Sequence, residues 1–362
     1  MNRDFIQGLQ LSELFYTEIV KQIIETQYPD VRYATALIGS GSEVLGFDDI
    51  ISTDHHWGPR MQIFLSDIKF EEIAEELKEL LREKLPYTFH GYSTHWSEPD
   101  PNDSMNQFTQ PKSEGKINHR VEITTVTRFI KQHLDIVSTK PSEKEWLVIP
   151  EHLLLEFTSG KVFFDSLGEL TKARKKLEYY PENVWKFKIL SLWEYIAQEV
   201  AFVGRTGMIG DEIGSRLETA RLVRYVIKMS YIMDKKYTPY QKWLGTGFKQ
   251  LSLAIRLEKV LLKILKTENW NEREKLLCQA YKVLIDKQNE LELTEKIEIK
   301  PQPYFNRPQV VVNISKIIEI LSKTIKKPLK SLSPPIGGVD NFIDETNILS
   351  NASLAKKALN FL

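Results

Sequence analysis

The stretch Leu37-Ile38-Gly39-Ser40-Gly41-Ser42 decides the fold of the first part of this chain. Apolar residues run from Val31 to Ile38, which predicts a buried strand that ends at the glycine-serine turn. Glycine has no Cβ, so a turn of this composition lets the backbone come close to a ligand. The stretch therefore predicts a strand followed by a turn at which a nucleotide could bind.

A second polar segment, Ser52-Thr53-Asp54-His55-His56-Trp57, follows the turn. Asp54 and His56 are two residues apart, and in an extended chain this spacing points both side chains to one face. Carboxylate and imidazole are both metal-ligating groups. The two segments together predict a site that combines a nucleotide turn with a metal-binding pair.

These motifs resemble the nucleotidyltransferase superfamily, whose members include kanamycin and streptomycin nucleotidyltransferases. More closely, residues 39–49 and the run Asp54-His55-His56-Trp57-Gly58-Pro59-Arg60 are similar to the uncharacterised DUF4037 family. The resemblance continues over most of the chain, at residues 153–160, Phe163-Phe164-Asp165, Tyr179-Tyr180-Pro181, Gly210-Asp211-Glu212, residues 239–245, Asn306-Arg307-Pro308 and residues 338–342.

The resemblance implies a metal-dependent enzyme that moves a nucleotidyl group from an NTP to a hydroxyl acceptor. It implies that the backbone around Gly39 and Ser40, with the Ser40 and Ser42 hydroxyls, binds the phosphates, because glycine permits close approach. Asp54 is the expected catalytic metal ligand, and the metal is expected to be Mg²⁺ or Mn²⁺. Arg60, Lys186 and Lys242 are candidate phosphate partners, although a surface cation is more often simply solvated.

His56 departs from the family pattern, because similar proteins usually carry a second aspartate there. Mg²⁺ is a hard cation that prefers oxygen, so an imidazole at position 56 is expected to weaken Mg²⁺ binding and to favour Mn²⁺ or Zn²⁺. An alternative to the enzyme is therefore a degenerate nucleotide-binding protein that closes on its ligand without turnover.

Strand character returns at residues 119–126, where β-branched residues surround Glu122. Alternation places Glu122 on the face opposite Val121 and Ile123. By position Glu122 matches the superfamily's third carboxylate, which binds metal or activates the acceptor hydroxyl. The alternative is an ordinary solvent-facing glutamate.

Helical spacing predicts helices over about residues 9–27 and over residues 67–84, the second one capped by Ser66, with a strand at residues 61–65 between them. From about residue 170 to residue 293 nearly every segment has helical periodicity. The predicted fold class is α+β: a nucleotidyltransferase-like N-terminal mixed sheet with flanking helices (residues 1–165), an α-helical bundle domain (166–300), and a C-terminal extension packing on the body (301–362).

Composition limits the other possibilities. The chain of 362 residues is 42% hydrophobic, and Lys+Arg and Asp+Glu both number 49, so nucleic-acid binding is not indicated by net charge. The single cysteine, Cys278, excludes an intramolecular disulfide. No apolar run is long enough for a membrane span, and the N-terminus lacks a signal-peptide pattern, so a cytoplasmic location is expected.

A metal hydrolase is a weaker alternative. Several histidines lie in the first half of the chain and, with Asp54, could hold zinc or manganese. Their spacing matches no His-Glu-x-x-His motif. A serine hydrolase is less favoured still, since the Gly-x-Ser-x-Gly elbow is missing.

Overall fold

The computed structural model describes residues 5–54, 56–102, 106–298 and 300–361, with the side chains of residues 54, 359 and 361 outside the description. The chain forms two compact units, Met1–Lys140 with Leu153–Glu178, and Pro141–His152 with Tyr179–Leu362. The three segments predicted from the sequence are a different partition of the chain and stay a prediction.

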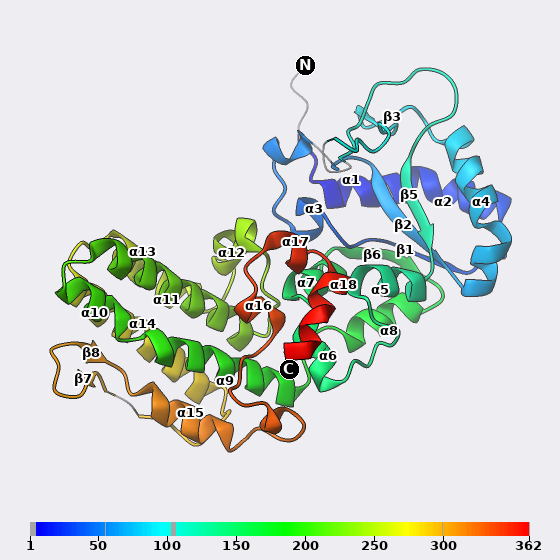
Figure 1. Cartoon of the computed structure of the whole chain (residues 1–362). Coiled ribbons are helices and arrows are strands. Elements are labelled where there is room, and N and C mark those ends of the chain that lie inside the picture. The colour runs from blue at the N-terminus through cyan, green and yellow to red at the C-terminus, as the bar shows by residue number, and fades with distance from the viewer. Residues whose placement is uncertain (1–4, 55, 103–105, 299, 362) are drawn as a thin grey trace. The chain divides into compact units, whose positions relative to one another are not determined.

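The first unit contains a four-stranded mixed sheet in the order β5-β2-β1-β6 (Figure 1). Strand β1 (Tyr33–Leu37) pairs antiparallel with β2 (Arg60–Leu65) and β6 (Lys161–Asp165), whereas β5 (Arg120–Thr124) runs parallel to β2. Because of these directions, the end of β1 and the beginnings of β2 and β5 lie at the same end of the sheet. The glycine-serine turn is therefore beside the first residues of two neighbouring strands.

Helices cover both faces of this sheet. The remaining elements that lie wholly or partly in the first unit are α1 (Gly8–Phe15), the π-helix η1 (Tyr16–Val20), α2 (Lys21–Gln27), α3 (Ser42–Leu45), the 3₁₀ turn η2 (Ile51–Asp54), α4 (Asp67–Lys84), β3 (Thr88–Phe89), β4 (Tyr92–Ser93), α5 (Val126–Leu134), α7 (Glu151–Thr158) and α8 (Glu169–Lys176).

The predicted helices of this unit are confirmed. Helices α1, η1 and α2 are continuous from Gly8 to Gln27, one residue longer than predicted. Helix α4 has the predicted bounds, and the Ser66 hydroxyl caps it by accepting a hydrogen bond from the Lys69 N–H. Both helices bury apolar side chains against one face of the sheet, in a core that includes Met61, Ile63, Leu65 and Val121.

The opposite face of the sheet is apolar at one end of the strands and polar at the other. At one end, the Phe64 ring makes an edge contact with Phe129 of α5, which in turn packs on Phe157 of α7. At the other end, where β2 and β5 begin, the same face carries Arg60, Gln62, Arg120 and Glu122, because successive side chains alternate between faces. The polar end is the one that adjoins the glycine-serine turn.

The second unit is mainly helical, as the sequence predicts, and helix α11 packs against both α9 and α14. Its elements are α6 (Glu143–Val148), α9 (Glu182–Glu199), α10 (Phe202–Met208), α11 (Glu212–Met233), α12 (Gln241–Phe248), α13 (Ala254–Lys266), α14 (Trp270–Glu290), β7 (Gln302–Pro303), β8 (Val310–Val311), α15 (Ile314–Ser322), η3 (Leu329–Ser331), α16 (Val339–Phe342), α17 (Thr346–Leu349), α18 (Ala352–Lys356) and η4 (Lys357–Phe361). The α+β class, a mixed sheet followed by helices, is confirmed. Among the described residues, none of the helices combines the length and the apolar content that a bilayer span requires.

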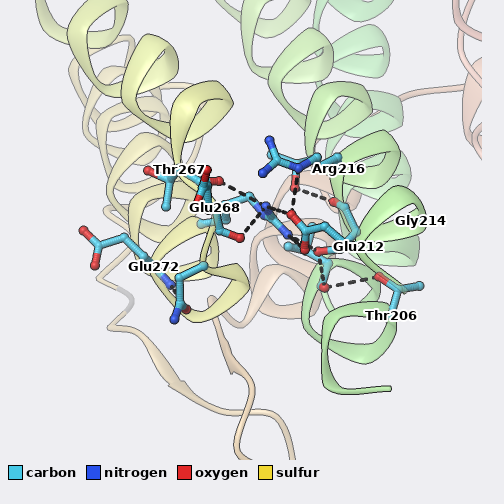
Figure 2. Close-up of polar contacts among 12 residues, drawn as sticks. Thr206, Glu212, Gly214, Arg216, Thr267, Glu268 and Glu272 are labelled. Atoms are coloured by element: carbon cyan, nitrogen blue, oxygen red, sulfur yellow. Dashed lines mark hydrogen bonds and ion pairs between the residues drawn. The ribbon is translucent and has the colours of Figure 1, made fainter. Parts of the chain in front are cut away.

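The Gly210-Asp211-Glu212 motif has a structural role at the start of α11. The Asp211 carboxylate caps the helix by accepting a hydrogen bond from the Gly214 N–H. Glu212 accepts two hydrogen bonds from the buried guanidinium of Arg273, at 2.7 and 2.9 Å, and also pairs with Arg216 (Figure 2). Hydrogen bonding to Arg273 lowers the pKa of Glu212 to about 2, so this pair joins α11 to α14 as an ion pair at neutral pH.

We predict that Glu212→Gln destabilises the protein by roughly 1–3 kcal/mol, because it leaves the buried Arg273 guanidinium without its counter-charge. The free energy of unfolding in urea measures the effect. Glu272→Gln is the matched control, because it breaks only the exposed pair with Lys263 and is expected to change stability by less than about 0.5 kcal/mol. Equal effects of the two substitutions would contradict the role given to Glu212.

Candidate functional site

The glycine-serine turn is supported from behind by the end of helix α7. Gly39 has a φ of +87°, and its N–H donates to the Glu156 carbonyl at 3.0 Å. Gly160 donates its N–H to the Val44 carbonyl at 2.9 Å, and a Cβ at Gly160 would collide with the Leu37 carbonyl. Residues 153–160, one of the family-like motifs, therefore form the base of the turn.

A buried ion pair fixes the turn to the sheet. Arg60, the first residue of β2, is 5% exposed, and Glu43, in α3, is 2% exposed. Arg60 Nε donates to Glu43 Oε1 at 2.7 Å, and Arg60 Nη2 donates to the Ser40 carbonyl at 2.5 Å. Arg60, which the sequence suggested as a phosphate partner, is thus engaged within the protein and holds the turn in shape.

Gln62 continues this support one step along β2. Its side-chain Oε1 accepts from the Ile38 N–H at 3.1 Å, and its Nε2 donates to the Ile38 carbonyl at 3.0 Å. The two bonds satisfy both backbone groups of the residue before Gly39 in a buried position. The Ser40 side chain, by contrast, is exposed, and Ser42 is half-buried.

Glu122 lies on β5 opposite Gln62, with Arg120 two residues earlier on the same face. Val121 is buried and Ile123 packs on the core, so the predicted alternation is confirmed. Glu122 is exposed, but crowding by protein atoms desolvates its carboxylate and raises its pKa, while the charges of Arg120 and Arg60 oppose the rise. A carboxylate with a raised pKa is a better proton acceptor than an ordinary surface glutamate.

Arg120 connects this face to the segment that carries His56. Desolvation and repulsion from Arg60 lower its pKa to about 10, so it stays charged at neutral pH. Arg120 Nη1 lies 2.5 Å from His56 Nδ1, and His56 Nε2 lies 2.9 Å from Asn106 Oδ1. Because a guanidinium only donates, Nδ1 accepts and Nε2 donates, and both imidazole nitrogens have protein partners.

The extended conformation assumed for Asp54 and His56 is wrong. Residues Ile51–Asp54 form a 3₁₀ turn, and His56 has a left-handed φ of +50°. The cause is Asp49, whose Oδ1 accepts from the Ile51 and Ser52 N–H groups and so starts a turn. The face on which the two side chains lie therefore does not follow from their spacing.

The Asp54 side chain, together with all of His55, lies outside the described residues. The backbone still limits where Asp54 can lie, since consecutive Cα atoms are about 3.8 Å apart and the Cα of Asp54 must lie within roughly 7.6 Å of that of His56.

Asp48, in the same segment, has a structural role. Its buried Oδ2 accepts from the Gly8 N–H at 2.7 Å and the Trp57 indole N–H at 3.0 Å.

The metal prediction rests on Asp54, His56 and Glu122. Among the residues whose side chains the structure describes, no group of three or more His, Cys, Asp or Glu residues is arranged to hold a metal ion. Glu122 offers one hard oxygen ligand, whereas the His56 nitrogens already have partners. The described side chains do not form a metal centre by themselves. The prediction of Mg²⁺ or Mn²⁺ therefore depends on the Asp54 carboxylate.

Two predicted phosphate partners belong to the second unit. Lys186, on α9, pairs with Glu182 at 2.7 Å, and Lys242, on α12, is exposed with its ammonium 4.9 Å from the Trp243 ring centroid. Their predicted role stays a prediction.

The sequence analysis missed three residues that shape the site, Glu43, Gln62 and Arg120. Strand alternation could have found two of them. Gln62 is two residues after Arg60 on β2, and Arg120 is two residues before Glu122 on β5, so each lies on the same face as a predicted site residue. Glu43 had no such signal, since its partner Arg60 is distant in sequence.

Comparisons with known proteins give a limited result. Residues 146–244 match the model of a family described as a domain of unknown function, DUF4037, which confirms the predicted resemblance over that segment. No functionally curated protein matches the chain. Among solved structures, the chain is similar to a nucleotidyltransferase-like protein from Exiguobacterium sibiricum, with 11% identity, 82% of each chain covered and a TM-score of 0.32. That TM-score is too low to support an inference about fold or function.

We predict that Gly41→Ala destabilises the turn more than Gly46→Ala does. Both glycines have positive φ values, +138° and +71°. Gly46 is in the left-handed helical region, where an alanine costs about 1–2 kcal/mol, whereas Gly41 is in a region that is essentially restricted to glycine, where an alanine costs about 1–3 kcal/mol. Only at Gly41 would the new Cβ also collide with Arg60 and Glu43, whereas at Gly46 there is open space. Thermal unfolding of the two variants measures the difference. A Gly41→Ala variant as stable as Gly46→Ala would show that the turn does not depend on the ion pair.

Proposed function

We propose that this end of the sheet binds a nucleoside triphosphate and transfers its nucleotidyl group to a hydroxyl acceptor. The observation that carries the proposal is the convergence of the glycine-serine turn with the beginnings of β2 and β5. Glu122 stands exposed at that end. Arg120, two residues before Glu122 on β5, contacts His56, which is two residues after Asp54 in the sequence.

The reaction can be assigned to these groups. The acceptor oxygen attacks the α-phosphorus of the NTP, the bond to the β-phosphate breaks, and pyrophosphate leaves. Glu122 is the proposed base that receives the hydroxyl proton, which is consistent with its raised pKa. The exposed Ser40 hydroxyl and the half-buried Ser42 are the proposed phosphate contacts, while the Gly39 amide is engaged with Glu156.

A divalent ion, Mg²⁺ or Mn²⁺, is part of the proposal, with Asp54 as its main ligand. Such an ion neutralises phosphate charge when bound. The described residues alone do not fit an ion, so we assign no step to it.

The alternative is nucleotide binding without turnover, and one observation favours it. His56 has both ring nitrogens engaged with Arg120 and Asn106, so it offers no free nitrogen for a metal in this arrangement. With Glu122 acting as the base, Asp54 is the one acidic ligand left, and such a site would bind a metal weakly and could retain the nucleotide without cleaving it.

We predict that Asp54→Asn abolishes pyrophosphate release while Asp49→Asn leaves it within about twofold of the wild type. The two residues lie in the same segment, but Asp49 accepts the backbone hydrogen bonds that start the turn, a role that an asparagine oxygen retains. Pyrophosphate is measured with each of the four NTPs, Mg²⁺ or Mn²⁺, and a panel of hydroxyl acceptors. Equal activity of both variants would remove Asp54 from the mechanism.

His56→Asp separates the enzyme from the degenerate binding protein. The substitution restores an oxygen ligand and releases Arg120 from its imidazole partner. If the native site is a weakened metal site, the variant is expected to bind Mg²⁺ about tenfold more tightly or more, and to release more pyrophosphate. Thermal shift with Mg²⁺ and an NTP measures the binding. No change in Mg²⁺ affinity would mean that position 56 is structural.

A further inference from the structure

The second unit contains a buried polar cluster centred on Glu151, and Asp340 of the family-like motif at residues 338–342 is part of it. Glu151, 2% exposed, donates its N–H to both carboxylate oxygens of Asp340, at 3.1 and 3.2 Å. The Glu151 carboxylate accepts from the Thr238 N–H at 2.9 Å and pairs with the fully buried Lys188 at 2.7 Å. Three segments distant in sequence are thus joined around one glutamate.

Beside this cluster lies a small cavity of about 20 Å³, lined by both polar and apolar residues. Its lining includes Arg224 and Lys228, one turn apart on α11, with Thr238 and Gln241 from the segment that leads into α12. A volume of this size holds about one water molecule. A larger ligand could enter only if a group that now fills part of the site moved away.

Two polar atoms at this cavity are left unsatisfied. Thr238 is 6% exposed, and its hydroxyl has no hydrogen-bond partner among the described residues; the same holds for the buried Nε of Arg224. Lys228 donates to the Asp340 carbonyl at 2.6 Å, and burial lowers its pKa. Unsatisfied buried donors are costly, so their collection around one cavity points to a ligand with several acceptor oxygens.

The carboxylate of Asp344 engages two of the residues that line the cavity. It accepts hydrogen bonds from both terminal nitrogens of Arg224 and from the Gln241 side-chain amide, and its bond to Arg224 lowers its pKa. Asp344 follows α16 in an irregular stretch, and its side chain is 58% exposed. An exposed side chain on such a segment can leave the site at little cost.

The charges around the site determine the sign of the charge that a ligand must carry. With Asp344 in place, three cations, Arg224, Lys228 and Lys188, face the acids Asp344, Glu151 and Asp340. Without it the cations are in excess by one. A ligand that replaces Asp344 therefore has to carry negative charge.

We propose that Arg224, Lys228, Thr238 and Gln241 form a binding site for the phosphoryl group of a small-molecule ligand, which Asp344 occupies as an internal substitute. A planar carboxylate uses only the two terminal nitrogens of Arg224 and leaves Nε and the Thr238 hydroxyl unsatisfied. A tetrahedral phosphoryl group has oxygens in more directions and can reach these donors as well. The site is independent of the nucleotide site proposed for the first unit.

Calorimetric titration of the full chain with inorganic phosphate tests this site. Asp344→Asn removes the competing carboxylate and is expected to raise phosphate affinity at least tenfold over the wild type. Glu345→Gln is the matched control, because it removes the neighbouring negative charge, whose carboxylate caps α17 and accepts from the Asn347 side chain. It is expected to leave the affinity within about twofold. Equal gains in both variants, or none in Asp344→Asn, would overturn the proposal.

Two further arms locate the gain. In the Asp344→Asn background, Thr238→Val is expected to lose most of it, and so is Arg224→Gln if that variant folds. Gly41→Ala in the same background is expected to keep it, because Gly41 belongs to the turn of the other unit. Retention of the gain in Thr238→Val, its loss in Gly41→Ala, or tighter binding of acetate than of phosphate would each contradict a phosphoryl site at this cavity.

Discussion

The arrangement at the end of the sheet depends on the buried ion pair between Arg60 and Glu43. Two charges at 5% and 2% exposure lose most of their hydration, which costs several kcal/mol for each ion unless the pair is well formed and its remaining donors are used. Here the same guanidinium also donates to the Ser40 carbonyl. The cost of burial is thus offset only when the turn has its observed shape, so the pair couples the conformation of the turn to the start of β2.

Hydrogen bonds add to this ion pair in holding the backbone behind the polar face. Gln62 holds both backbone groups of Ile38, and α7 holds the amide of Gly39, so the strand and the turn are fixed from two sides. Glu122 and Arg120 extend the same face across the neighbouring strand. A binding surface whose groups are already fixed loses less entropy on binding than a flexible one.

Regular elements could be predicted from the sequence because their patterns are local. Helix α4 was predicted at its observed bounds, and its Ser66 cap and its inward-facing leucines follow from the spacing of residues within one turn. The side of β5 on which Glu122 lies also follows from strict alternation. The conformation of residues 51–54 and of His56 did not follow, because the hydrogen bonds of Asp49 start a turn where an extended chain was assumed. The partners of His56 were equally hidden, since Asn106 and Arg120 come from distant segments.

Each unit contains a buried ion pair between a glutamate and a basic residue. In the first unit, Glu43 and Arg60 lie directly behind an exposed polar turn; in the second, Glu151 and Lys188 lie beside the small cavity. A hydrophobic pair of similar volume would often stabilise a fold at least as well. A buried ion pair has a further effect where its glutamate also holds backbone groups in place. The Glu151 carboxylate accepts from the Thr238 N–H, and the Glu151 N–H donates to Asp340. The retained charges therefore fix polar atoms at defined positions, which is a requirement of binding sites more than of stability alone.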